Sequence, residues 1–165
     1  KSTAAREGAE MAAPAATIHS IFTRSAARIA RGRSRLDLVP RRHGFPMNRI
    51  LLAEDDNDMR RFLAKALQNA GYDVVSFDNG RSAYERIREE PFTLLLTDIV
   101  MPEMDGIELA RRATELDPDL KVMFITGFAA VALNPDSNAP REAKVLSKPF
   151  HLRELVTEVE RLLAA

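Results

Sequence analysis

Three consecutive acidic residues, Glu54, Asp55 and Asp56, directly follow the apolar segment Ile50–Ala53. Adjacent carboxylates repel one another unless a cation lies between them. Oxygen ligands at this density suit Mg²⁺, which binds a few carboxylates and keeps several of its waters. The alternative is that the three acids cap the start of a helix. Taken alone, the cluster leaves both interpretations open.

Three further polar residues, Asp98, Thr126 and Lys148, each follow or end another apolar segment. The carboxylate of Asp98 could serve as a metal ligand or as a nucleophile. The Thr126 hydroxyl and the Lys148 ammonium could hold phosphoryl oxygens. A single threonine or lysine in such a place is usually a local hydrogen-bonding or surface residue. Together with the acidic cluster, the set supplies the groups that transient phosphorylation of an aspartate requires.

The elements that must position these groups are short apolar strands that alternate with amphipathic helices. The predicted strands are Arg49–Ala53, Asp73–Phe77, Phe92–Thr97, Val122–Thr126 and Ala143–Ser147. The first predicted helix begins at Asp58; Asn57 can cap its start and Gly71 can end it. The other predicted helices are Gly80–Glu90, Asp105–Leu116 and a last helix that begins after His151. This alternation predicts an α/β doubly wound parallel sheet with helices on both faces. In such folds, ligands bind beyond the carboxyl ends of the strands.

The composition excludes several classes of site. The 165 residues contain no cysteine, so disulfides, thiolate metal sites and cysteine nucleophiles are excluded. Residues 47–165 carry 15 basic and 21 acidic residues, which argues against nonspecific nucleic-acid binding by this part. No run of 18 apolar residues occurs, and no membrane association is expected for 47–165.

Residues 1–46 differ from the rest, with nine basic and three acidic residues. Their alanine, arginine and serine content predicts a dispensable, mostly disordered leader, and Met47 could serve as a natural start. The alternative is a basic amphipathic helix over Ile18–Leu36 that lies on a membrane surface or mimics a targeting peptide. We expect two parts, this basic or disordered leader, which need not be native, and a folded domain over 47–165.

That folded domain, 47–165, resembles the receiver domain of bacterial two-component response regulators. Asp98 stands in the pattern D-x-x-M-P-x-M-D-G, and the spacings are 43 residues from Asp55 to Asp98, 28 more to Thr126 and 22 more to Lys148. The resemblance implies a flavodoxin-like five-stranded sheet in the order 2-1-3-4-5. It also implies a signalling phosphoacceptor, not an enzyme in the usual sense, which assists its own phosphoryl transfer and dephosphorylation.

The resemblance assigns a role to each matching residue. Asp98 would be the phosphoacceptor, Thr126 the switch hydroxyl and Lys148 the lysine that holds the phosphoryl group, with a cis bond between Lys148 and Pro149. The Mg²⁺ ligands would be Glu54, Asp55, Asp98 and the backbone carbonyl of Val100, while Asp56 would cap the following helix.

Two features depart from the family pattern. Val145 occupies a position where receivers often have tyrosine or phenylalanine. Pro135 and Pro140 would break or shorten the fourth helix, which is expected within Phe128–Pro140. The face that transmits the signal in many receivers is therefore expected to be unusual here.

Details such as the segment Lys144–Arg153 resemble the CpdR-type regulators of alphaproteobacteria. This implies a single-domain cytoplasmic regulator, phosphorylated through a histidine kinase or histidine phosphotransferase, whose output partner would be the ClpXP protease. A motility-type or phosphorelay-shuttle receiver with another partner is the main alternative. A haloacid-dehalogenase-type phosphatase is disfavoured, because it would need an aspartate where Val100 stands. A receiver that works without phosphorylation is also disfavoured, because it would not need the intact set of site residues. No P-loop motif is present.

Overall fold

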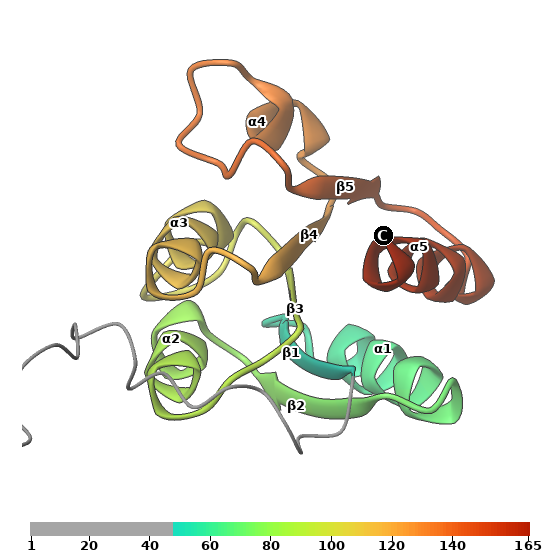
Figure 1. Ribbon diagram of the computed structural model, residues 1–165. Helices are drawn as coiled ribbons and strands as arrows, with labels where there is room; N and C mark the ends of the chain where they lie inside the picture. Colours follow the sequence, from blue (N-terminus) through green and yellow to red (C-terminus); the bar gives the residue numbers. More distant parts are fainter. Residues whose placement is uncertain (1–47) are drawn as a thin grey trace, which may run out of the picture. The chain divides into compact units, whose positions relative to one another are not determined.

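Residues 48–165 are described by the structure, a computed structural model, and they form a five-stranded parallel sheet with helices on both faces (Figure 1). The strand order is β2-β1-β3-β4-β5, so the predicted fold class and order are confirmed. The strands are β1 (Arg49–Ala53), β2 (Asp73–Phe77), β3 (Leu94–Thr97), β4 (Lys121–Thr126) and β5 (Lys144–Ser147). The helices are α1 (Asn57–Asn69), α2 (Gly80–Glu89), α3 (Gly106–Leu116), α4 (Ala129–Leu133) and α5 (Leu152–Ala164). The leader predicted over 1–46 lies outside the described residues.

The sheet separates two apolar cores, because successive strand side chains point to opposite faces. Leu95 and Phe124 lie in the core beneath α2 and α3, whereas Leu96 and Ile125 lie in the core beneath α1 and α5. All four side chains are fully buried. Burial on both faces explains why these strands appear in the sequence as continuous apolar runs.

The first helix begins one residue earlier than the periodicity predicts. Asn57 is the first helical residue, and the N-cap is Asp56, whose Oδ1 accepts a hydrogen bond of 2.9 Å from the Met59 amide. The prediction that Asn57 caps the helix is therefore wrong, and the capping role implied for Asp56 is confirmed. Gly71 ends the turn after α1 with a φ of 95°, a conformation that favours glycine.

One strand boundary, the start of β3, differs from the predicted one by two residues. β3 begins at Leu94, not at Phe92, because Thr93 instead donates from its amide and its hydroxyl to the carbonyl oxygen of Arg49. Phe92 nevertheless remains buried in the core beneath α2 and α3. The starts of β4 and β5 each differ by one residue from those expected.

The fourth helix is short, as the two prolines predicted. α4 has five residues and ends before Asn134, and the chain then turns, with the Ser137 amide donating to the Asn134 carbonyl. In Figure 1, α4 and the loop that follows it lie beyond α3 at the β5 edge of the sheet. Within 48–165, no helix combines the length and apolar character needed to cross a bilayer.

Candidate functional site

The carboxyl end of β1 places Glu54 inside the molecule. Its side chain is 1 % exposed, and its Oε1 accepts a hydrogen bond of 3.2 Å from the amide of Asp56. Arg60, in the first turn of α1, donates from its guanidinium to the Glu54 carbonyl oxygen at 2.7 Å. The side chain and the main chain of Glu54 are thus both held by the turn into α1.

The carboxyl end of β3 presents Asp98 next to that cluster. Asp98 is mostly buried, its amide donates to the Ala53 carbonyl at 3.0 Å, and its Oδ1 accepts from the Ile99 amide at 2.6 Å. The amide of Gly106, at the start of α3, donates to the Ile99 carbonyl at 2.7 Å. The segment Asp98–Ile99 is therefore anchored by β1 on one side and by the start of α3 on the other.

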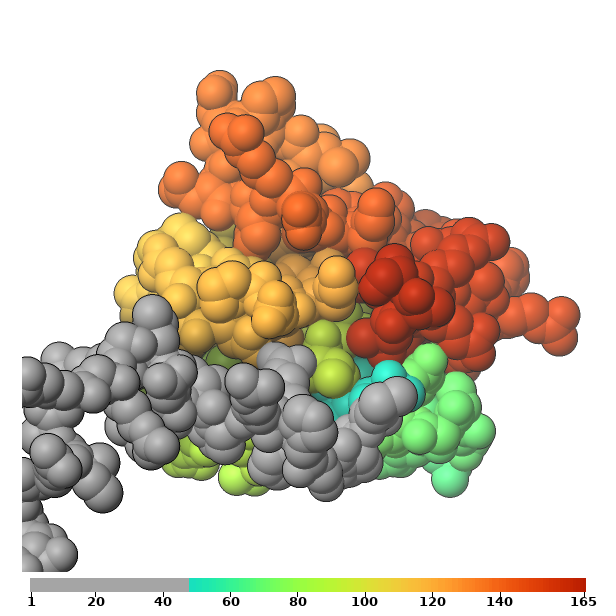
Figure 2. All heavy atoms as spheres, viewed as in Figure 1, coloured from blue at the N-terminus to red at the C-terminus, as the bar shows by residue number. Residues whose placement is uncertain are grey.

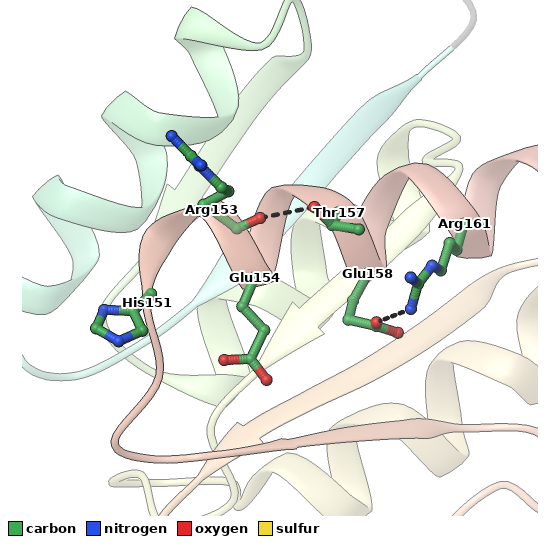
Figure 3. Close-up of a pocket in the computed structure, with 6 residues that line it drawn as sticks. All are labelled: His151, Arg153, Glu154, Thr157, Glu158 and Arg161. Atoms are coloured by element: carbon green, nitrogen blue, oxygen red, sulfur yellow. Dashed lines mark hydrogen bonds and ion pairs between the residues drawn. The ribbon is translucent and has the colours of Figure 1, made fainter.

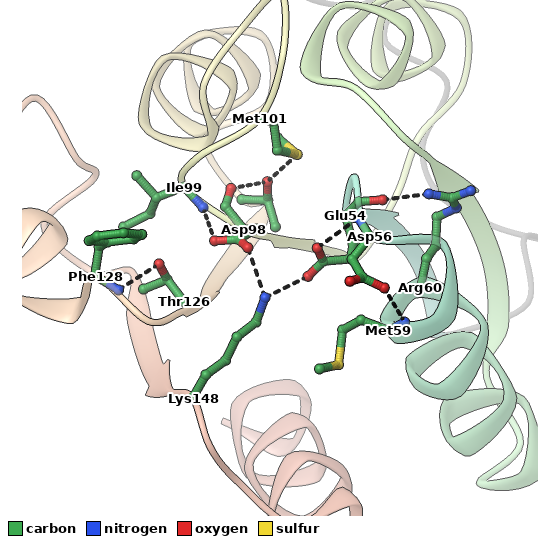
Figure 4. A network of polar contacts seen from close by, with 11 residues as sticks. Glu54, Asp56, Met59, Arg60, Asp98, Ile99, Met101, Thr126, Phe128 and Lys148 are labelled. Atoms are coloured by element: carbon green, nitrogen blue, oxygen red, sulfur yellow. Dashed lines mark hydrogen bonds and ion pairs between the residues drawn. The ribbon is translucent and has the colours of Figure 1, made fainter.

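Lys148 joins the two carboxylates. From the end of β5, its Nζ donates to Asp98 Oδ2 at 2.8 Å and to Glu54 Oε2 at 2.9 Å (Figure 4). The three residues lie far apart in the sequence and on three different strand ends. The fold brings together the carboxylates and the ammonium that the sequence singled out.

Burial and charge oppose each other at this triad. Desolvation raises the pKa of the Glu54 carboxyl above its usual range, although Lys148 and the Asp56 amide offset part of that effect. Desolvation also disfavours the charged form of Lys148, but its hydrogen bonds to Asp98 and Glu54 outweigh this and raise its pKa. Lys148 is therefore held as a cation between the two acids.

The carboxylates of Glu54, Asp55 and Asp98 form a cluster that could hold a metal ion. Ligand oxygens of the three side chains all lie within 4.8 Å of one another. Two of these acids are buried and Asp55 is exposed, so one side of the cluster is open to solvent. Such an oxygen-only donor set with room for water fits Mg²⁺. The carbonyl of Val100 as a fourth ligand stays a prediction.

Thr126 lies at the end of β4, at the same carboxyl edge of the sheet as Asp98 and Lys148. Figure 4 shows it next to Asp98 and Lys148. Its side chain is fully buried, and its Oγ1 accepts a hydrogen bond of 3.0 Å from the Phe128 amide. With that acceptor position filled, the hydroxyl hydrogen can still donate to an oxygen bound at Asp98.

Two contributions to the site were not predicted. The guanidinium of Arg60 on the Glu54 carbonyl could have been suspected only from its place in the first turn after the acidic cluster. Phe128 contributes its amide to Thr126, and its side chain is 58 % exposed beside the site. A backbone donor leaves no signal in the residue type, so sequence reasoning had no means of finding it.

A separate cavity of about 660 Å³ lies against the outer side of α5, with His151 and Arg161 among the residues that line it (Figure 3). Its polar groups bond mainly within the helix: Thr157 donates to the Arg153 carbonyl and Arg161 pairs with Glu158. No set of groups converges there as it does at Asp98, so the strand-end site remains the candidate.

Comparison with known proteins gives one consistent result. The model of the response regulator receiver domain family matches residues 50–160. The chain is 82 % identical over 119 residues to the response regulator receiver protein CpdR of Brucella abortus, covering 72 % of this chain and 99 % of that protein. It is 38 % identical to part of the sensor kinase CckA of the same organism, covering 69 % of this chain and 12 % of the kinase. A receiver protein structure from Sinorhizobium medicae is similar with a TM-score of 0.66 and 33 % identity, covering 72 % and 95 % of the two chains.

Proposed function

Because the chain belongs to the response regulator receiver domain family, we propose that Asp98 accepts a phosphoryl group from a phosphohistidine and that this controls the binding of a partner protein. The observation that carries the proposal is the pair of hydrogen bonds from Lys148 to Asp98 and Glu54. They hold a buried carboxylate, a second acid and a cation at one point on the carboxyl edge of the sheet, where ligands of such folds bind.

In the transfer step, a carboxylate oxygen of Asp98 attacks phosphorus as the bond to the histidine nitrogen breaks, and the imidazole leaves and takes up a proton. Mg²⁺ held by Glu54, Asp55 and Asp98 would offset the repulsion between the anionic nucleophile and the anionic donor. Lys148 and the Thr126 hydroxyl would bind oxygens of the transferred group. Hydrolysis by water at phosphorus would release phosphate and restore the carboxylate.

The output of this switch is a protein–protein contact. The similarity to a protein named CpdR over nearly its whole length supports a regulator that acts through such a contact. We propose the ClpXP protease as the partner, with the chain as its adaptor in the cytoplasm, and a histidine kinase or histidine phosphotransferase as the donor. The 38 % identity to part of a sensor kinase named CckA supports a phosphorelay of this kind.

Labelling with a small phosphodonor tests the chemistry. Acetyl phosphate with Mg²⁺ should add one phosphoryl group to Asp98, which intact-protein mass spectrometry and peptide mapping detect. Asp98→Asn and Asp98→Ala should abolish the labelling, and chelation of Mg²⁺ should stop it in the wild type. Labelling that persists in both variants would overturn the assignment of Asp98.

Affinity capture tests the output. Wild type, Asp98→Asn and phosphorylated wild type are used as baits, and the captured proteins are identified by mass spectrometry. Capture of the protease subunits by only one phosphorylation state supports the adaptor function. Capture of motility or phosphorelay proteins instead would favour the alternative receiver function.

A further inference from the structure

An exposed apolar groove lies next to the phosphoacceptor, between the loop after β3 and the start of the segment from α4 to β5. Its volume is about 550 Å³, and it is widely open to solvent. Its apolar lining comes from Ile99, Val100 and Met101 in the loop, Ile107 in α3 and Val131 in α4. Val100 and Val131, which line the same groove, are 57 % and 47 % exposed, so both side chains are accessible to a partner. We call this feature the α3–α4 groove.

The polar lining of the α3–α4 groove is acidic. It includes Asp105, Glu108 and Asp136, and it includes no lysine or arginine among the described residues. The charge of Glu108 is largely offset, because Arg111 and Arg112 both pair with it. Within residues 48–165, Asp105 and Asp136 are therefore the lining carboxylates whose charge no ion pair offsets.

We propose that the α3–α4 groove docks an amphipathic segment of a partner protein that presents apolar side chains together with lysine or arginine. The apolar floor matches the buried face of such a segment, and the flanking carboxylates match its cations. Acidic segments would meet like charges in the lining, so the groove should discriminate against them by charge.

The position of the groove gives it a link to Asp98. Ile99 is one of the residues that line the groove, and its amide donates to Asp98 Oδ1 at 2.6 Å. A change at that oxygen therefore acts on one wall of the groove. Figure 2 shows the segment that supplies the opposite wall, at residues 129–140, projecting past α3, where a partner can reach it.

This inference deepens the proposed function, because it names a docking surface and the chemistry of its occupant, but its test needs no phosphodonor. A synthetic helical peptide with leucines on one face and lysines on the other is titrated into the unphosphorylated protein, and amide chemical shifts are followed by NMR. A matched peptide with glutamate in place of lysine serves as the charge control. Failure of Asp98 labelling would leave this result unaffected, so the two proposals fail separately.

We expect shifts at Ile99–Met101, Val131 and Asp136 with the lysine peptide, and binding at least about tenfold weaker with the glutamate peptide. Val131→Ser should weaken binding by roughly tenfold, whereas Leu133→Ser, on the same helix but outside the groove, should not. Asp136→Asn should weaken it about threefold, and Glu142→Gln in the same loop should leave it unchanged. Equal binding of both peptides, equal effects of Val131→Ser and Leu133→Ser, or shifts elsewhere on the surface would overturn the proposal.

Discussion

Gly106 lies directly against the backbone of Asp98, and the carbonyl oxygen of Asp98 occupies the space that a side chain at position 106 would need. The same glycine donates from its amide to the Ile99 carbonyl. The first residue of α3 therefore lets the backbone of α3 approach the backbone of Asp98 closely. The sequence motif contained this glycine, but its contact with Asp98 is visible only in three dimensions.

Gly106→Ala should therefore disturb the site more than the fold of the sheet. The added methyl group must displace the Asp98 carbonyl, and we expect a loss of roughly 1–3 kcal/mol in stability together with slower labelling of Asp98. Gly127→Ala is the matched control, because nothing lies within 4 Å of a Cβ at that position. Equal melting temperatures and labelling rates for the two variants, measured by calorimetry and mass spectrometry, would contradict this role for Gly106.

Replacement of Lys148 tests the cation that joins Asp98 and Glu54. Lys148→Met should lower the rate of labelling by acetyl phosphate by about 100-fold, because the transferred group loses a preorganised donor. Lys144→Met removes the same charge from the exposed part of β5 and should leave the rate unchanged. A rate for Lys148→Met within twofold of the wild type would show that the ammonium plays no part in the transfer.

The Glu108 carboxyl should stay charged at a lower pH than an ordinary glutamate does. Hydrogen bonds from Arg111 and Arg112 lower its pKa from 4.5 to about 2. Because the folded-state pKa is below the unfolded value, the stabilising contribution is complete above pH 4.5 and is lost as the pH falls from 4.5 towards 2. An NMR titration of the side-chain carboxyl carbon should give a midpoint near 2, and a midpoint near 4.5 would contradict the ion-pair geometry.

Phosphorylation should change amide exchange most within residues 127–141. Movement of the Thr126 hydroxyl towards a bound phosphoryl oxygen would lengthen its hydrogen bond from the Phe128 amide, which lies at the start of α4. The Val145 side chain is small and has one restricted torsion, so it cannot switch between a buried and an exposed rotamer as an aromatic side chain could. Hydrogen exchange with and without Mg²⁺ and beryllofluoride measures this, with Asp98→Ala as the control. An unchanged 127–141 segment with exchange altered on another face would refute the mechanism.

Deletion of residues 1–46 should leave the domain folded and competent for labelling. All five strands and the carboxylate cluster lie after Met47. The melting temperature of the 47–165 protein should agree with that of the full chain to within about 2 °C, and labelling of Asp98 should proceed at the same rate. A much lower melting temperature for the shorter protein would show that the first 46 residues stabilise the domain.

The fold could be predicted largely from local patterns. β1 and β2 have the predicted boundaries because their apolar runs are bounded by the acidic residues after Ala53 and by the turn at Gly71. The start of β3 was misplaced because Phe92 is buried like a strand residue, although β3 begins only at Leu94. Between them, the Thr93 hydroxyl donates to the Arg49 carbonyl oxygen. Burial and strand pairing leave the same apolar signal in the sequence, so the pattern could not separate them.

The site was predictable in its residue types but not in its contacts. Asp98 and Lys148 stood out because carboxyl ends of parallel strands meet at one edge. That Lys148 bonds to Asp98 and Glu54 together depends on distances across three strands. The acidic α3–α4 groove could not have been anticipated, since its lining residues come from α3, α4 and two loops.

The brevity of α4 has a consequence for how this protein can diverge. A helix of five residues is not stable on its own, so the course of the chain between β4 and β5 depends on loop contacts and tolerates insertions and deletions. The proposed site residues Asp98, Thr126 and Lys148 lie instead at the carboxyl ends of strands of the sheet. Under the proposed function, substitutions between β4 and β5 should alter partner choice while labelling of Asp98 stays intact, which would make the two properties separable targets for engineering.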